Sequence, residues 1–246
     1  FTISDIHAPD GTPAHPPIVG SRLVFSGNAG NGTYLTMPSN CAGGQTTVLR
    51  VKAHGGAEDS DSFTTAVGAD ECESAPFNPT VETQASGATD SPEPSTVEVN
   101  MPQLQPGVRA QSHLLTAKLT LPEGAGLNPS VANNLQTCTD EQFKKGTDDP
   151  IECPAGSKIG TTEVQTAALD QPLGGDVYIG QPLSNDPSSG EQFRIFLAVA
   201  NERYGVNVRL IGNVFPNLET GQLTAVVPNN PQAPFNSFKV HIDGGP

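Results

Sequence analysis

The sequence predicts an all-β chain of two Ig-like β-sandwich domains, the second larger and carrying a short helical insert. Short runs with alternating apolar and polar side chains recur along the chain, which is the pattern of half-buried strands. The breaks between these runs are rich in turn-forming residues, and the 246 residues include 26 Gly and 23 Pro. Helix signals are confined to one stretch. Together these features are typical of β-sandwiches.

The first domain is expected to span residues 1–78. Within residues 48–53, Leu49, Val51 and Ala53 share one strand face and Val48, Arg50 and Lys52 share the other. This alternation predicts a sheet with one buried and one solvated side. The strands expected in this domain cover residues 1–6, 18–25, 33–37, 45–53 and 62–67.

The second domain is expected to span residues 79–246. A change in composition at residues 74–79, Ser-Ala-Pro-Phe-Asn-Pro, predicts the boundary, and residues 84–94 lack large apolar side chains and are expected to form a loop. Residues 193–199 are almost continuously apolar, which predicts a central strand. The expected strands cover residues 97–101, 113–121, 159–165, 175–179, 193–200, 206–215, 222–227 and 235–242.

The helical insert is expected near residues 129–145. Asn128 is a good N-cap and Pro129 suits the first position of a short helix that would end at Leu135. Thr139 and Gln142 have the spacing of a capping box, and Gly146 is expected to stop this second helix.

Four cysteines, Cys41, Cys72, Cys138 and Cys153, allow three disulfide pairings. Their spacings match no zinc-binding pattern. The sequential pairing, Cys41 with Cys72 and Cys138 with Cys153, is favoured because it keeps each bridge inside one expected domain. A Lys-poor chain rich in Thr, Ser, Asn, Gly and Pro suggests secretion, where disulfides persist. Since residue 1 is Phe and no leader pattern follows it, the chain is expected to be a mature form or a piece of something longer.

The charge balance limits the partners. Twelve basic and 26 acidic residues give a net charge of −14, which disfavours nucleic acid and anionic membranes as partners. No apolar run approaches the roughly 20 residues of a membrane-spanning helix, so membrane insertion is not expected.

Motifs of catalysis are missing from the sequence. The five histidines lie in unrelated contexts, and no nucleophile elbow, zinc-protease or nucleotide-binding pattern occurs. We therefore expect no enzyme, no cofactor and no metal, although a Ser-His-Asp triad depends on geometry and keeps a secreted hydrolase as a third hypothesis. Residues 58–61 and 148–149 are acidic and could offer calcium ligands, but solvated turns are the favoured interpretation.

Several short segments occur in a characteristic order: residues 34–41, 72–79, 119–124, 127–130, 135, 138, 153–161, 175–182, 220–224, 234–235 and 244–245. In that order they resemble a repeated module of very large secreted actinobacterial proteins of uncharacterised function. The resemblance covers most of residues 33–246. It implies secretion and tandem β-modules, and it brings no catalytic or binding residues.

The leading functional hypothesis is a non-catalytic structural module of the bacterial exterior that associates with copies of itself or with neighbouring modules into a filament, sheath or surface layer. Strand addition could join the copies. The segment expected to add is Phe1, Thr2, Ile3, Ser4, Asp5 and Ile6, which could equally be an ordinary first strand. The alternative is an adhesin or carbohydrate-binding module with a glycan ligand, which the absence of Trp and the presence of only three Tyr disfavour.

Overall fold

The computed structural model describes residues 22, 24, 28–29, 32–33, 37–85, 87, 93–101, 111–125 and 136–243. The chain divides into two compact units, Phe1–Thr36 and Met37–Pro246. In the first unit, strands β1 (Asn28–Ala29) and β2 (Gly32–Thr33) form a small antiparallel hairpin. All the elements described below belong to the second unit.

The second unit contains two sheets. Its strands are β3 (Thr46–Lys52), β4 (Glu58–Thr64), β5 (Thr80–Ala85), β6 (Ser95–Asn100), β7 (Ala117–Thr120), β8 (Lys158–Gln165), β9 (Leu173–Gly180), β10 (Phe193–Asn201), β11 (Val206–Pro216), β12 (Leu223–Val227) and β13 (Ser237–Ile242). Its helix is α2 (Asp140–Phe143), and its 3-10 turns are Cys72–Ser74, Ala155–Ser157, Pro187–Ser189 and Glu202–Tyr204.

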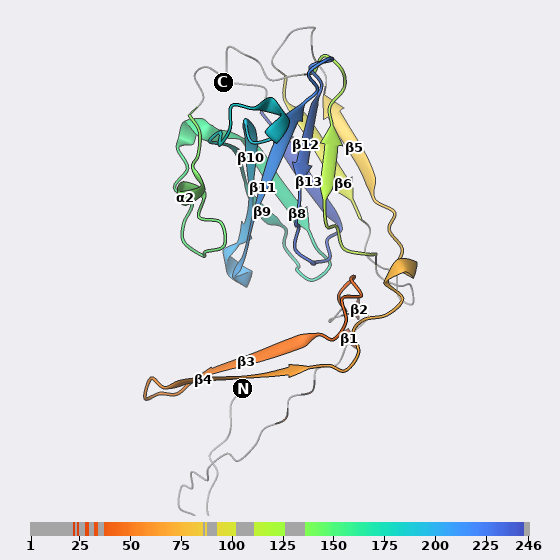
Figure 1. The fold of residues 1–246 in the computed structure, drawn as a ribbon, viewed down its shortest axis with the longest axis vertical. Coiled ribbons are helices and arrows are strands. Elements are labelled where there is room, and N and C mark those ends of the chain that lie inside the picture. Colours follow the sequence, from red (N-terminus) through yellow and green to blue (C-terminus); the bar gives the residue numbers. More distant parts are fainter. Residues whose placement is uncertain are drawn as a thin grey trace, which may run out of the picture. The chain divides into compact units, whose positions relative to one another are not determined.

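Nine of these strands form one curled antiparallel sheet in the order β5-β6-β13-β8-β9-β10-β11-β12-β7 (Figure 1). The all-β class is therefore confirmed. The predicted central strand is also confirmed: β10 lies between β9 and β11, and its residues 196–199 are buried.

Both faces of β10 pack against a hydrophobic cluster. On one face, Leu197 lies in a cluster with Val177 of β9 and Val227 of β12. Side chains of β7, β8 and β13 pack against the same cluster, so opposite halves of the curled sheet meet there. On the other face, Phe196 lies against Phe143 of the helical insert.

The insert follows the predicted capping chemistry. The Thr139 hydroxyl accepts a hydrogen bond from the Gln142 backbone, and the Gln142 side chain accepts one from the Thr139 backbone. The helix ends at Lys144, which has a left-handed φ of 54°, and Gly146 follows with a φ of 82°. The other expected helix, residues 129–135, lies outside the described residues.

The expected domain boundary near residue 79 stays a prediction; the two compact units of the structure divide between Thr36 and Met37. Residues 37–78 contain no buried residue and supply one two-stranded sheet, so the division into two Ig-like sandwiches stays a prediction. The loop expected at residues 84–94 overlaps the end of β5, because Gln84 and Ala85 pair with Thr96 and Ser95 of β6.

Candidate functional site

The most unusual surface of the second unit is the hairpin formed by β3 and β4. We call residues 41–72 the arm. Every residue of both strands is exposed, and among the described strands β3 and β4 pair only with each other. The exposed fractions of Leu49, Val51 and Phe63 are 61%, 50% and 71%. The predicted burial of the face with Leu49 and Val51 is therefore wrong, since these side chains are exposed and no described side chain covers that face.

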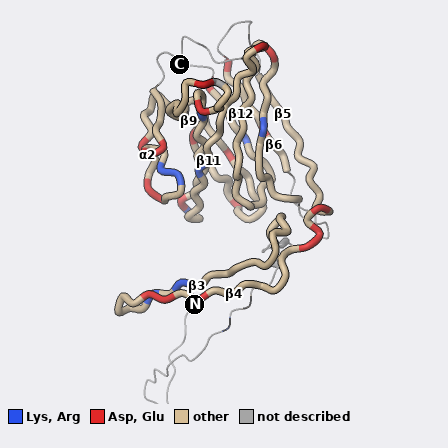
Figure 2. The backbone as a smooth tube through the Cα atoms, in the orientation of Figure 1, with Lys and Arg blue, Asp and Glu red and all other residues tan. Residues whose placement is uncertain are grey.

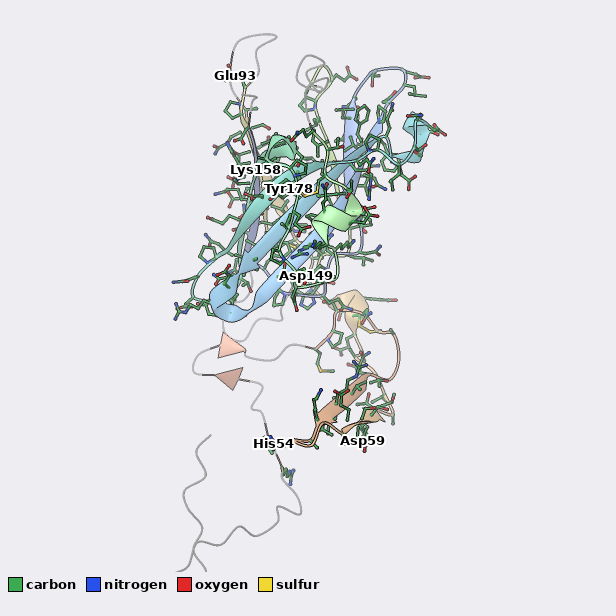
Figure 3. All side chains as sticks on the ribbon, turned by 90° about the vertical axis from the view of Figure 1, so that its left-hand side faces the viewer. His54, Asp59, Glu93, Asp149, Lys158 and Tyr178 are labelled. Carbon is green, nitrogen blue, oxygen red and sulfur yellow. A yellow bond between two sulfur atoms is a disulfide. The ribbon has the colours of Figure 1, made fainter. Side chains whose placement is uncertain are left out.

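The arm presents two different faces. Strand pairing places Leu49 opposite Asp61 and Val51 opposite Asp59, so one face mixes apolar side chains with carboxylates. The other face is polar apart from Val48, and there Lys52 forms an ion pair of 2.7 Å with Glu58. Figure 3 shows side chains standing out from both faces of the hairpin, which carries Asp59.

The two strands of the arm also differ in charge. β3 carries Arg50 and Lys52 and no acidic residue, whereas β4 carries Glu58, Asp59 and Asp61 and no basic residue. Figure 2 shows the basic residues on one strand of the hairpin and the acidic residues on the other. The arm thus has one basic and one acidic edge.

A disulfide closes the base of the arm. Cys41 and Cys72 are bonded, with their Cα atoms 5.9 Å apart. Just beyond the bridge, the Thr65 backbone N–H donates to the Gln45 carbonyl and the Gln45 N–H donates to the Thr65 hydroxyl. A lone two-stranded hairpin is only marginally stable in water, so this covalent closure holds the arm in register.

The acidic residues at the start of β4 form neither a turn nor a calcium loop. The Asp59 and Asp61 carboxylates accept hydrogen bonds from the backbone N–H groups of Ser60 and Ser62, both at 2.8 Å. The favoured prediction of a solvated turn is therefore wrong here, because these residues belong to β4. Among the described residues, no group of three or more His, Cys, Asp or Glu side chains could hold a metal ion.

The second disulfide, Cys138–Cys153, completes the sequential pairing and fastens the helical insert. Within the insert, the backbone carbonyls of Phe143, Lys144 and Asp149 all accept hydrogen bonds from the buried Arg209 guanidinium. These hydrogen bonds, together with the disulfide, hold the insert in place, so the role we assign to the insert is structural.

A hydroxyl–imidazole–carboxylate arrangement lies on the polar face of the nine-stranded sheet. The Thr96 hydroxyl is 2.9 Å from Nδ1 of His241, and Nε2 of His241 is 3.5 Å from an Asp243 oxygen. The side chains of His241 and Asp243 are 41% and 56% exposed. The longer distance is at the edge of hydrogen bonding, and an exposed pair gains little from charge, so this group lacks the geometry of an activated nucleophile.

A second polar cluster joins Lys158, Asp176 and Tyr178. The Asp176 carboxylate lies 2.7 Å from the Lys158 ammonium and accepts a hydrogen bond of 3.0 Å from the Tyr178 hydroxyl. Burial of the ring, followed by the bond and negative charge of Asp176, raises the pKa of Tyr178 to about 12. The phenol therefore stays protonated near neutral pH and supports packing between β8 and β9, where Figure 3 places Lys158 and Tyr178.

The segment expected to take part in strand addition, Phe1–Ile6, lies outside the described residues. The exposed arm was not predicted as a site, although the alternation at residues 48–53 marked one of its faces. No described helix is long and apolar enough to cross a membrane. Comparisons with protein-family models, curated proteins and solved structures found no match.

Proposed function

We propose that this chain is a non-catalytic structural module of an extracellular or cell-surface protein and that it acts by associating with copies of itself. The observation that carries the proposal is the arm, whose alternating apolar side chains are exposed and are covered by none of the described residues. Exposed strands offer unpaired N–H and C=O groups to other strands, and natural proteins cover such edges. A partner strand is the simplest cover for this one.

The two disulfides support the extracellular placement, because such bonds persist in oxidising compartments. The resemblance to tandem secreted modules agrees with this extracellular placement. A division of the chain into two Ig-like modules is part of the same proposal. A filament, sheath or surface layer would follow if association continues from copy to copy.

The test is the mass of the purified chain by light scattering, with electron microscopy of the same sample. Species heavier than the 25.5 kDa of one chain support the proposal. A mass of 25.5 kDa at every concentration contradicts it and moves attention to the adhesin or glycan-binding alternative, which a glycan-array screen would examine.

A further variant tests the role of the N-terminal segment. Deletion of residues 1–6 is expected to stop the growth of large assemblies while leaving the far-ultraviolet circular dichroism spectrum of the sheet intact. Unchanged growth would refute strand addition by this segment.

A further inference from the structure

The two edges of the arm differ in their free hydrogen-bonding groups. The backbone hydrogen bonds at the two ends of the ladder, from Thr65 to Gln45 and from Ala53 to Ala57, show which residue pairs are hydrogen-bonded. Because such pairs alternate along an antiparallel ladder, every second residue points its N–H and C=O groups outward. The outward residues of β3 are Thr46, Val48, Arg50 and Lys52, and those of β4 are Glu58, Ser60, Ser62 and Thr64.

The outer edge of β4 is closed from within the arm. Its outward N–H groups at Ser60 and Ser62 already donate to the carboxylates of Asp59 and Asp61. An incoming strand would have to displace both carboxylates. Local side-chain bonds of this kind, and charges at an edge, are means by which proteins protect edge strands.

The outer edge of β3 remains open. No described residue outside the arm pairs with β3, and no side-chain bond to its outward N–H groups is present among the described residues. Val48 lies in the middle of this edge and is 54% exposed. The arm therefore offers one open edge and one closed edge.

We propose that two copies of this chain pair through their β3 edges, antiparallel and about a two-fold axis, to form a four-stranded sheet in the order β4-β3-β3-β4. This inference rests on the proposed self-association and names the contact that would begin it. Each copy has one open edge in its arm, and this pairing occupies that edge. Association through the arm therefore stops at a dimer.

Charge favours this pairing over the joining of two β4 edges. Centring the pair on Val48 sets Arg50 of each copy opposite Thr46 of its partner, and it keeps the two arginines four positions apart. Joining two β4 edges would instead bring the carboxylates of Glu58, Asp59 and Asp61 from both copies together. Like charges that face each other across strands are destabilising.

The size of the rest of the chain disfavours joining β3 of one copy to β4 of the next. Such a stack repeats every two strands, roughly 10 Å, with a twist of roughly 45° per hairpin. The roughly 170 residues that follow the arm need a diameter of roughly 40 Å. In such a stack, the bodies of neighbouring copies, each attached at the base of its arm, would have centres only roughly 25 Å apart. Bodies of this diameter would collide at that distance.

The two-fold arrangement avoids this collision. In an antiparallel pair, the base of one arm lies beside the tip of the other. A strand of the length of β3 is roughly 23 Å long, so the two bodies leave from opposite ends of the four-stranded sheet. Growth beyond the dimer would then need a second contact, which the deletion of residues 1–6 examines separately.

A proline substitution tests the open edge with a matched control. Val48 and Ser62 are cross-strand partners whose N–H groups both point outward, so proline at either position removes no hydrogen bond of the hairpin ladder. Val48→Pro is expected to abolish the dimer in sedimentation equilibrium of the full chain. Ser62→Pro, on the closed edge, is expected to leave it intact.

A charge substitution at the same two positions gives an independent measurement. Val48→Lys places two ammonium groups opposite each other on the two-fold axis, and it should weaken the dimer at least tenfold, with recovery in high salt. Ser62→Lys should change the dimerisation constant less than twofold. Both positions are exposed, so neither change should disturb folding.

The outcomes separate this inference from the proposed function. A wild-type chain that stays at 25.5 kDa overturns both. Assembly that survives both Val48 variants, or that fails equally in the Val48 and Ser62 variants, overturns the assignment to the β3 edge and leaves self-association standing. Selective loss in the Val48 variants supports the two-fold pairing.

Discussion

Replacing Cys41 and Cys72 with serine is expected to release the arm while the nine-stranded sheet stays folded. The arm has no buried residue, so little besides the ladder, the Lys52–Glu58 pair and the disulfide holds it. For the sequence separation of 31 between the two cysteines, the chain-entropy model assigns the bridge about 3.7 kcal/mol. This figure is an upper limit, because hydrogen bonds of Ser39 and Asn78 already hold the chain on either side of the arm.

The assay is amide hydrogen exchange of the full chain, followed by mass spectrometry. A loss of 3.7 kcal/mol corresponds to an increase of up to roughly 400-fold in the exchange rate of the inward amides of the arm, those of Leu49, Asp61 and Phe63. Amides of β10 should exchange as in the wild-type chain, because β10 lies at the centre of the large sheet.

The matched control removes the other bridge. Replacing Cys138 and Cys153 with serine opens a loop of sequence separation 15, worth about 3 kcal/mol, and should speed exchange in the insert but not in the arm. Full protection of the arm without the Cys41–Cys72 bridge would refute the view that covalent closure stabilises it. If the sample is monomeric by mass, that result would show that the hydrogen bonds of the β3–β4 ladder stabilise the arm without the disulfide.

Three further predictions concern the large sheet and the segments beside it in the second unit. Phe143→Ala should lower the free energy of unfolding in urea by about 3–5 kcal/mol, because its fully buried ring stacks on Phe196 with centroids 4.6 Å apart. The Tyr178 phenol should titrate near pH 12 by ultraviolet absorbance, and its contribution to stability, complete below pH 10, should fall as pH rises toward 12. Titration near pH 10 would contradict the burial of the ring and its bond to Asp176. Burial lowers the pKa of His113, so the unfolded chain binds more protons below pH 6.5 and stability should fall as pH drops through that range; His113→Gln should flatten this dependence in thermal melts.

Local signals in the sequence predicted much of the large sheet. The continuous apolar run at residues 193–199 marked the central strand, because a strand buried on both faces needs apolar side chains on both. The capping-box spacing of Thr139 and Gln142 marked the helix, because both hydrogen bonds are made within four residues.

The order of the strands in the large sheet could not be predicted from the sequence. β13, at the end of the chain, inserts between β6 and β8 and pairs with both. This arrangement depends on packing between segments far apart in the chain, such as Phe238 and Val240 against the cluster of Val177 and Leu197. Neither periodicity nor turn signals carry that information.

The arm shows why local patterns misled at the candidate site. Asp59, Ser60, Asp61 and Ser62 have the composition of a turn, yet pairing with β3 makes them a strand. Alternation in β3 predicted that Leu49 and Val51 face a core. The pattern indicates that a face is suited to burial, and none of the residues that the structure describes covers this one.

The mass of the native chain as a function of concentration tests the central claim most directly. Light scattering should show a mass that rises with concentration from 25.5 kDa to at least twice that value, and that stays at 25.5 kDa in the Val48→Pro variant. A wild-type mass of 25.5 kDa across the whole range would contradict self-association through the arm.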